Sequence, residues 1–216
     1  MSKKSKILIA VVLIALCSLF YFVINDSKFK AEFETEEILE NSDENLNNND
    51  ENSLYESVDD IVRALEEKDF ETLAIYVHPE RGLRFSSSEY ISIANDKIFT
   101  PEEVENLFSN NKKYVWGLSD GSGIPIELTF ADYYKKFVYS AKFSEAENVS
   151  FTDPIGVGNT TNNMRDVYDN AKVVELHFSG FNEKYKGMDW QSLYLVLEEI
   201  EGDLYLVGIA HGAWSI

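Results

Sequence analysis

Two histidines in the last third of the sequence are the residues whose type and position best suit chemistry. His177 lies late in one expected β-strand and His211 late in the final one. Antiparallel strands joined by short turns would bring both to one end of a sheet, and a shift of one residue in register decides whether they share a face. On a shared face, with Glu175 or Asp189 beside them, the imidazoles could bind a divalent metal or serve in acid–base catalysis.

A structural role for the histidines is the competing interpretation. No His-x-His or His-Glu-x-x-His spacing supports a metal site, and an aromatic neighbour such as Trp214 could enclose one ring. The third histidine, His78, precedes Pro79 at an expected helix end, where the charge of an imidazolium would suit the helix dipole. We therefore assign no catalytic residue from the sequence and keep His177 and His211 as candidates.

Other familiar motifs are absent or incomplete. The run DGSG at residues 120–123 lacks the frame of a nucleophile elbow and the alternating acids of a calcium loop, so it predicts a tight turn. The run GVG at residues 156–158 lacks the rest of a dinucleotide fingerprint. The single cysteine, Cys17, lies in an apolar N-terminal segment, so residues 54–216 can form neither a disulfide nor a cysteine metal site. No cofactor is expected.

The strands that would position the two histidines close the sequence. Long runs of β-branched, aromatic and aliphatic residues predict strands at 172–179, 192–200 and 204–214. The run EGD at 201–203 joins the last two strands as a hairpin, and residues 181–189 join the first two. This pattern predicts an antiparallel meander.

Helices are predicted to precede the meander. Apolar residues recur at helical spacing in two consecutive segments that bend near Asp69. Their core-facing positions are Val58, Ile61, Val62, Leu65, Phe70, Leu73, Ala74 and Val77. Thr100 and Thr129 are typical caps of two further helices, and strands are expected at 83–85 and 113–117. The sequence therefore predicts an α+β domain with N-terminal helices packed on a curved antiparallel sheet.

Residues 7–25 are uncharged and almost wholly apolar, and as a helix they would approach the hydrocarbon thickness of a bilayer. The basic tail of residues 1–6 precedes them, so the positive-inside rule predicts a single-pass anchor with this tail in the cytoplasm. Two alternatives stay open: a cleaved signal peptide, and a lipoprotein signal in which Cys17 is lipidated. All three place the rest of the chain outside the cytoplasm, and the uncleaved anchor would hold it at the cell membrane.

An acidic, Asn-rich and disordered tether is expected at residues 26–53, because its scattered apolar residues cannot offset the entropy of ordering the chain. The extracytoplasmic domain then spans residues 54–216, a size that fits one domain. The whole chain has a net charge of −19, and the domain is itself acidic. Because a phosphate backbone would be repelled, nucleic acid is not an expected partner.

Several stretches carry a resemblance to known proteins. The helical run ALEEKDFETLAIYVHPERGLRFS and the C-terminal YLVGIAHGAWSI resemble the cone-shaped nuclear-transport-factor-like (cystatin-like) fold. With YVWGLSDGSGIPIELTFADYYKKFVY they also resemble a group of uncharacterised membrane-anchored exported proteins of Gram-positive bacteria. This resemblance covers most of residues 54–216. It implies a location and an architecture, and because that fold hosts enzymes and binding modules alike it implies no activity.

The sequence favours a function without catalysis. An anchor, a tether and a missing catalytic constellation are typical of a membrane-anchored extracytoplasmic binding or interaction module, whose partner would be a small ligand or an envelope protein. The alternative is a metal-dependent or acid–base hydrolase that uses His177 and His211. A cavity for a ligand would favour the first reading, and convergence of the two imidazoles would favour the second.

Overall fold

A computed structural model describes residues 52–119 and 122–214. The chain divides into two compact units, Met1–Ser53 and Leu54–Ile216, and the elements below belong almost entirely to the second. The predicted basic tail, the anchor and all of the tether but its last two residues lie outside the described residues. Among the helices that are described, none is long and apolar enough to cross a membrane.

Two consecutive helices open the described chain, as predicted. The first spans residues 52–67 and buries its predicted apolar face. Lys68 then adopts a left-handed conformation (φ 58°) that ends this helix. The side chain of Asp69 caps α2 (Phe70–Tyr76) by accepting a hydrogen bond from the backbone N–H of Thr72. The predicted bend near Asp69 is therefore confirmed.

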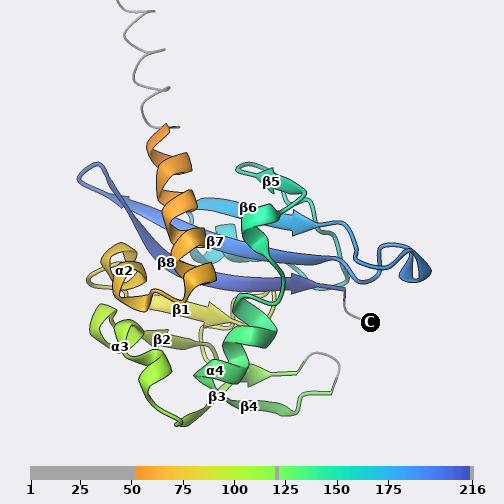
Figure 1. Ribbon diagram of the computed structural model, residues 1–216, viewed down its shortest axis with the longest axis horizontal. Helices are drawn as coiled ribbons and strands as arrows, with labels where there is room; N and C mark the ends of the chain where they lie inside the picture. Colours follow the sequence, from red (N-terminus) through yellow and green to blue (C-terminus); the bar gives the residue numbers. More distant parts are fainter. Residues whose placement is uncertain (1–51, 120–121, 215–216) are drawn as a thin grey trace, which may run out of the picture. The chain divides into compact units, whose positions relative to one another are not determined.

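Six strands form the main sheet, in the order β2-β1-β8-β7-β6-β5 (Figure 1). Their bounds are β1 (Leu83–Ser86), β2 (Lys97–Phe99), β5 (Asn148–Ser150), β6 (Lys172–Phe178), β7 (Gln191–Ile200) and β8 (Asp203–Ala213). The predicted meander of β6, β7 and β8 is confirmed. Glu201 and Gly202 form its tight turn, with φ angles of 54° and 93° that suit a two-residue hairpin loop.

One strand pair departs from the predicted antiparallel sheet. β1 runs parallel to β8, with Arg84 opposite Gly208 and Ser86 opposite Ala210. The other neighbouring strands described in this sheet pair antiparallel. A parallel pair needs a long crossover connection, and here most of the domain lies between the two strands. The composition of a strand indicates which side chains are buried but not the direction of its neighbour, so the sequence did not reveal this pairing.

The remaining elements include a separate two-stranded sheet of β3 and β4. The bounds are α3 (Pro101–Glu105), η1 (Leu107–Ser109), β3 (Lys113–Leu118), β4 (Pro125–Thr129), α4 (Phe130–Tyr133), η2 (Tyr134–Val138), η3 (Phe143–Glu145), α5 (Met164–Val167) and η4 (Glu183–Tyr185). Thr100 and Thr129 cap α3 and α4 as predicted. β2, β4 and β5 were not predicted, because strands of three to five residues carry too little alternation.

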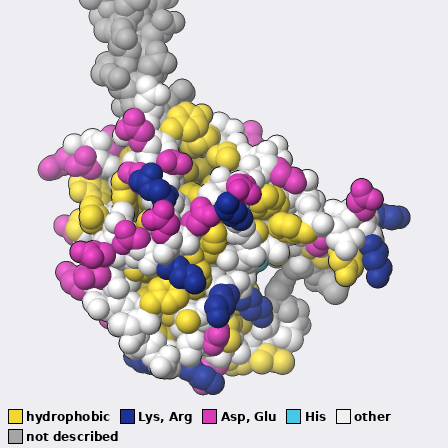
Figure 2. Space-filling view, in the orientation of Figure 1, with side chains coloured by type: hydrophobic (Ala, Val, Ile, Leu, Met, Phe, Trp, Pro, Cys, Tyr) yellow, Lys and Arg dark blue, Asp and Glu magenta, His cyan; other side chains and the backbone are white. Residues whose placement is uncertain are grey.

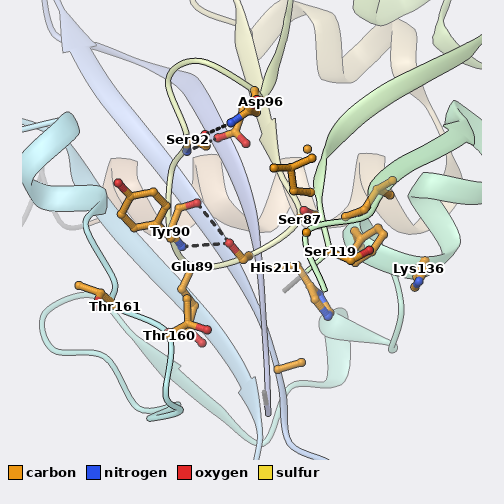
Figure 3. Close-up of a pocket in the computed structure, with 18 of the residues that line it drawn as sticks. Ser87, Glu89, Tyr90, Ser92, Asp96, Ser119, Lys136, Thr160, Thr161 and His211 are labelled. Carbon is orange, nitrogen blue, oxygen red and sulfur yellow. Dashed lines mark hydrogen bonds between the residues drawn. The ribbon is translucent and has the colours of Figure 1, made fainter. Parts of the chain in front are cut away.

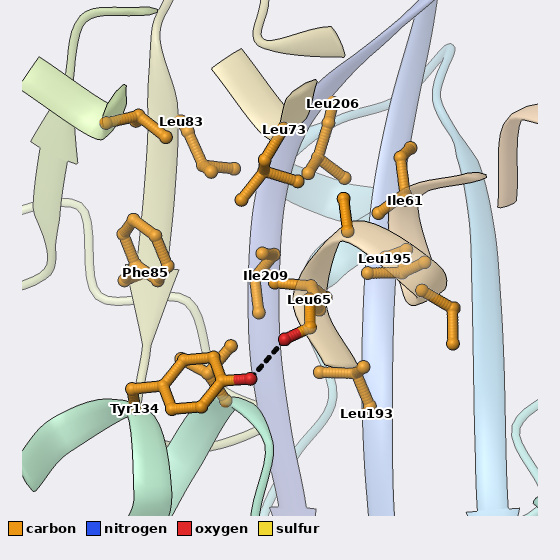
Figure 4. Packing of buried hydrophobic residues seen from close by; sticks show 14 of the residues in the cluster. Ile61, Leu65, Leu73, Leu83, Phe85, Tyr134, Leu193, Leu195, Leu206 and Ile209 are labelled. Atoms are coloured by element: carbon orange, nitrogen blue, oxygen red, sulfur yellow. Dashed lines mark hydrogen bonds between the residues drawn. The ribbon is translucent and has the colours of Figure 1, made fainter. Parts of the chain in front are cut away.

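The larger core lies on one face of the main sheet. The first helix packs there against β7 and β8, and its Ile61 and Leu65 lie close to Leu195 and Ile209 (Figure 4). The hydroxyl of Tyr134 in η2 donates a hydrogen bond to the carbonyl of Leu65. This bond ties the first helix to η2 across the same core.

Aromatic side chains fill the space between β1 and the β3–β4 hairpin. Trp116 stacks on Tyr133 with ring centroids 4.0 Å apart, and its indole N–H donates to the carbonyl of Leu128 at 2.9 Å. Phe85 meets Phe130 edge to face. Trp116, Tyr133, Phe85 and Phe130 are fully buried, so these rings belong to the core, as expected of most aromatic residues on such elements.

A smaller core covers the opposite face of the main sheet. Ile91 from the β1–β2 loop and Met164 from α5 pack there against Tyr194 and Val196 of β7. The main sheet is therefore buried on both faces, by helices on one side and largely by loops on the other.

Replacing Leu65 tests the larger core. Leu65 is fully buried, so Leu65→Ala should lower the free energy of unfolding by about 2–5 kcal/mol, through lost burial and the cavity left behind. The measurement is urea denaturation followed by circular dichroism. Ile75→Ala is the matched control, because Ile75 is 72% exposed on α2 and should change stability by less than about 0.5 kcal/mol. Equal effects of the two substitutions would contradict this packing.

Candidate functional site

The two candidate histidines lie on opposite faces of the main sheet. Leu193 of β7 pairs with His211, whereas Ser192 pairs with His177. Because neighbouring residues of a strand point to opposite faces, His211 shares the face of the larger core and His177 faces the other way. The structure does not bring the two imidazoles together, so they form no common metal or acid–base site.

His177 belongs to a buried polar cluster with two partners. The hydroxyl of Ser192 donates to a carboxylate oxygen of Glu175 at 2.6 Å and lies 2.8 Å from Nδ1 of His177. Ser192 has a single hydroxyl proton, which it donates to Glu175. Nδ1 of His177 must therefore carry a proton and donate it to the serine oxygen. Burial lowers the pKa of His177, although Glu175 and Glu147 oppose the shift. The serine is fully buried and its proton is engaged, so this cluster is not built to attack a substrate.

Glu175 instead anchors the chain that precedes α5. Its carboxylate accepts hydrogen bonds from the backbone N–H groups of Ile155 (2.6 Å) and Gly156 (2.9 Å). A Cβ at Gly156 would lie 2.6 Å from the ring of Trp190, so only glycine fits this close approach. The predicted neighbour of His177 is thus in place, with a structural role.

Asp189 and His78 also have structural roles. Asp189 accepts from the backbone N–H groups of Phe181 and Asn182, which holds the loop between β6 and β7. Nδ1 of His78 accepts hydrogen bonds from the backbone N–H groups of Glu80 and Arg81, at 3.1 Å each. A nitrogen that accepts cannot carry a proton, so the predicted imidazolium at this helix end is corrected to a neutral ring that caps a turn.

His211 lines a large cavity in the described part of the chain. Its ring meets Phe137 edge to face at 5.7 Å, and its Nδ1 is buried with no hydrogen-bond partner among the described residues. Burial, with a smaller contribution from Lys136, lowers the pKa of His211 to about 4. The ring is therefore neutral near pH 7.

The cavity has a volume of about 860 Å³ and lies beside the end of β8 (Figure 3). Its walls come from the β1–β2 loop, the β3–β4 hairpin, η2 and the loop before α5. β1 stops pairing with β8 at Ser86, which leaves room beside His211. Hydroxyl groups are the commonest polar lining, from Ser87, Ser88, Ser92, Ser119, Thr160 and Thr161. Its rim includes the exposed side chains of Tyr90, Leu118 and Trp214.

Two carboxyl groups of the β1–β2 loop line this cavity. Glu89 is only 3% exposed, and burial, with a contribution from Glu175, raises its pKa to about 7. Burial also raises the pKa of Asp96 to about 6, although its hydrogen bond from the backbone N–H of Ser92 and the nearby Arg84 oppose the shift. Perturbed carboxyl groups in a cavity mark a candidate site.

The loop that carries these carboxyl groups is fixed by a distant side chain. The amide of Asn163 accepts from the backbone N–H of Ile91 at 2.7 Å and donates to its carbonyl at 3.1 Å. Ser86 adds a hydroxyl bond to the carbonyl of Tyr90. The site was missed at the sequence level because nothing in the run SSSEYISIAND separates Glu89 from a solvated surface acid.

No group of three or more His, Cys, Asp or Glu side chains suited to a metal ion occurs within residues 52–119 and 122–214. Comparison of the chain with protein-family models, curated proteins and solved structures finds no match. The geometry of the cavity is therefore the basis for inferring a function.

The pH dependence of stability tests the burial of Glu89. The folded protein keeps a proton on Glu89 that the unfolded chain releases above about pH 4.5, so native stability falls as the pH rises from there to about 7. Glu89→Gln cannot ionise, and its stability relative to the native protein should rise by on the order of 3 kcal/mol across this range. Urea denaturation at a series of pH values measures the difference. Glu105→Gln, at an exposed position of α3, is the control, and parallel profiles for Glu89→Gln and the native protein would refute the assignment.

Proposed function

We propose that this protein is a membrane-anchored extracytoplasmic binding module that holds a small polar ligand in the cavity beside β8. The observation that carries the proposal is the cavity itself, about 860 Å³ in volume and lined by hydroxyl, amide and carboxyl groups. Two of its lining residues, Glu89 and His211, are more than nine-tenths buried. Such a preformed concave site with a few convergent polar groups is typical of ligand binding.

The location is part of the proposal and is supported by the sequence. Residues 7–25 have the length and apolar character of a membrane anchor, and the acidic segment 26–53 would act as a tether. The resemblance to exported Gram-positive proteins with a nuclear-transport-factor-like fold agrees with this reading. An α+β domain with helices on one face of a largely antiparallel sheet is compatible with that fold.

The surface charge supports a partner other than nucleic acid. Acidic side chains gather over the first helix and α2 on the face that Figure 2 shows. Asp59, Glu67 and Glu71 are exposed residues of these two helices. Such a surface repels a phosphate backbone. A small ligand or an envelope protein remains the proposed partner.

The alternative of a hydrolase that uses His177 and His211 together has no geometric support. The two rings lie on opposite faces of the sheet, and Ser192 beside His177 is fully buried. We therefore do not extend the proposal to catalysis by this pair.

Blocking the cavity tests ligand binding. Thr161 is exposed and lines the cavity, so Thr161→Trp should fill part of it without disturbing the core. Compounds from a library of small polar molecules that raise the Tm of the full-length chain should have little effect on this variant. Asn111→Trp, exposed in the loop before β3, should respond as the native chain does. If no compound raises the Tm of the native chain, or if compounds raise the Tm of the native chain and of Thr161→Trp equally, the proposed site is contradicted.

Protease accessibility tests the location. With an epitope tag at its C-terminus, the full-length chain expressed in a Gram-positive host should stay with the membrane, and protease added to protoplasts should remove the tag. Deletion of residues 1–25 should leave a soluble chain whose tag is protected inside the cell. A tag that survives external protease in the full-length chain would contradict the proposed topology.

A further inference from the structure

We propose, building on the binding function above, that the ligand is an organic cation whose ammonium or guanidinium group pairs with Glu89. Glu89 lines the cavity, and only 3% of its surface is exposed. Among the residues that the structure describes, no hydrogen bond or ion pair is made by this carboxyl. A buried carboxyl group without a donor or counter-ion is costly unless something in the cavity pairs with it.

Within residues 52–119 and 122–214, Glu89 forms no salt bridge, and no basic side chain is among the causes of its pKa shift. A second carboxyl, Glu175 on β6, acts on Glu89. Burial raises the pKa of the Tyr194 phenol on β7, and both carboxyl groups lie close enough to raise it further. The Nε of Arg84 donates to the hydroxyl of Tyr168 at 2.9 Å, its charge acts on Asp96, and one of its terminal nitrogens has no hydrogen-bond partner among the described residues. The end of the cavity at Glu89 therefore favours a positive group.

The opposite wall of the cavity does not repel a cation strongly. His211 is neutral above about pH 4. Lys136 is the basic residue that lines the cavity, and its ammonium lies over the ring of Phe137, 4.9 Å from the centroid. Figure 3 shows Lys136 and Glu89 at separate places around the cavity. At the rim, the exposed rings of Tyr90 and Trp214 offer faces on which an organic cation can rest.

An organic cation fits these groups better than a metal ion. A divalent metal needs several ligating side chains at short range, and the described residues contain no group of three or more His, Cys, Asp or Glu that could supply them. An ammonium or guanidinium carries three or five N–H donors. One of them can pair with Glu89 while others reach lining hydroxyls such as those of Ser88 and Thr161.

The proposal implies that binding is linked to proton release. A cation beside Glu89 favours its ionised form, so the bound complex loses the proton that the free protein holds below about pH 7. Glu175 and Tyr194 face Glu89 from the sheet, and Tyr90, Asp96, Lys136 and His211 are the other titratable groups that line the cavity. Asp96 can contribute a smaller release at lower pH, because its pKa is about 6.

A matched pair of probes tests the charge requirement. Nα-acetyl-arginine amide carries one guanidinium, and Nα-acetyl-citrulline amide replaces it with a neutral urea of nearly the same shape. In isothermal titration of the full-length chain, the arginine probe should bind at least about tenfold more tightly. Its affinity should rise about tenfold as the pH increases from about 5 to about 7, with proton release detected from buffers of different ionisation enthalpy. A lysine probe and its Nε-acetyl form provide the same comparison for an ammonium.

Variants test whether Glu89 is the residue that binds the positive group of the probes. Glu89→Gln should weaken the cationic probes at least about tenfold and abolish the pH dependence, whereas Glu105→Gln should bind as the native chain does. Circular dichroism and melting confirm that Glu89→Gln is folded. Undetectable binding of both cationic probes at millimolar concentration, equal binding of the neutral probes, or unchanged binding by Glu89→Gln would overturn the cation assignment. Neutral compounds that bind the native chain but not Thr161→Trp would then leave the binding module itself intact.

Discussion

The pairing of β7 with β8 is the constraint on which the rest of the structure depends. Their long antiparallel ladder fixes, residue by residue, which side chains face the helices and which face the opposite core. Leu193 and Leu195 thereby enter the larger core, whereas Tyr194 and Val196 enter the smaller one. A slip of one residue would exchange both sets at once. Because each face is covered by its own packed layer, the two cores hold the register together.

The same register places His177 and His211 on opposite faces of the sheet, each with different polar neighbours. On one face, Glu175 and Ser192 are saturated by hydrogen bonds from neighbouring groups, and such groups stabilise loops. Around the cavity, Nδ1 of His211 has no hydrogen-bond partner within the described residues. The cluster around His177 therefore stabilises the architecture, whereas His211 faces a cavity. A missing partner alone does not mark a site, because the indole N–H of Trp190 and the hydroxyl of Tyr194 also lack one within the described residues. This contrast separates the cavity from the buried cluster around His177, which resembles a catalytic group in composition alone.

Periodicity and capping made much of the fold predictable. The apolar face of residues 52–67, the bend at Asp69 and the cap at Thr100 follow from short-range physics that any single segment contains. The candidate site did not follow, because its chemistry is made by distant contacts. Glu89 becomes a buried acid only when Asn163 ties its loop down through Ile91. His78 likewise seemed charged from its place at a helix end, whereas the orientation of two later N–H groups requires a neutral ring.

The position of β8 has a consequence for the order in which the chain can fold. It is the last strand of the described chain, yet it lies between β1 and β7 in the sheet. β1 can pair with β2 early, but its pairing with β8 is possible only after nearly all of the domain has been synthesised. The loop closed by this pairing is long, and its entropy must be overcome before the contacts compensate for it. A chain truncated before β8 would keep the edge of β1 open to other chains, a state prone to aggregation rather than to partial function.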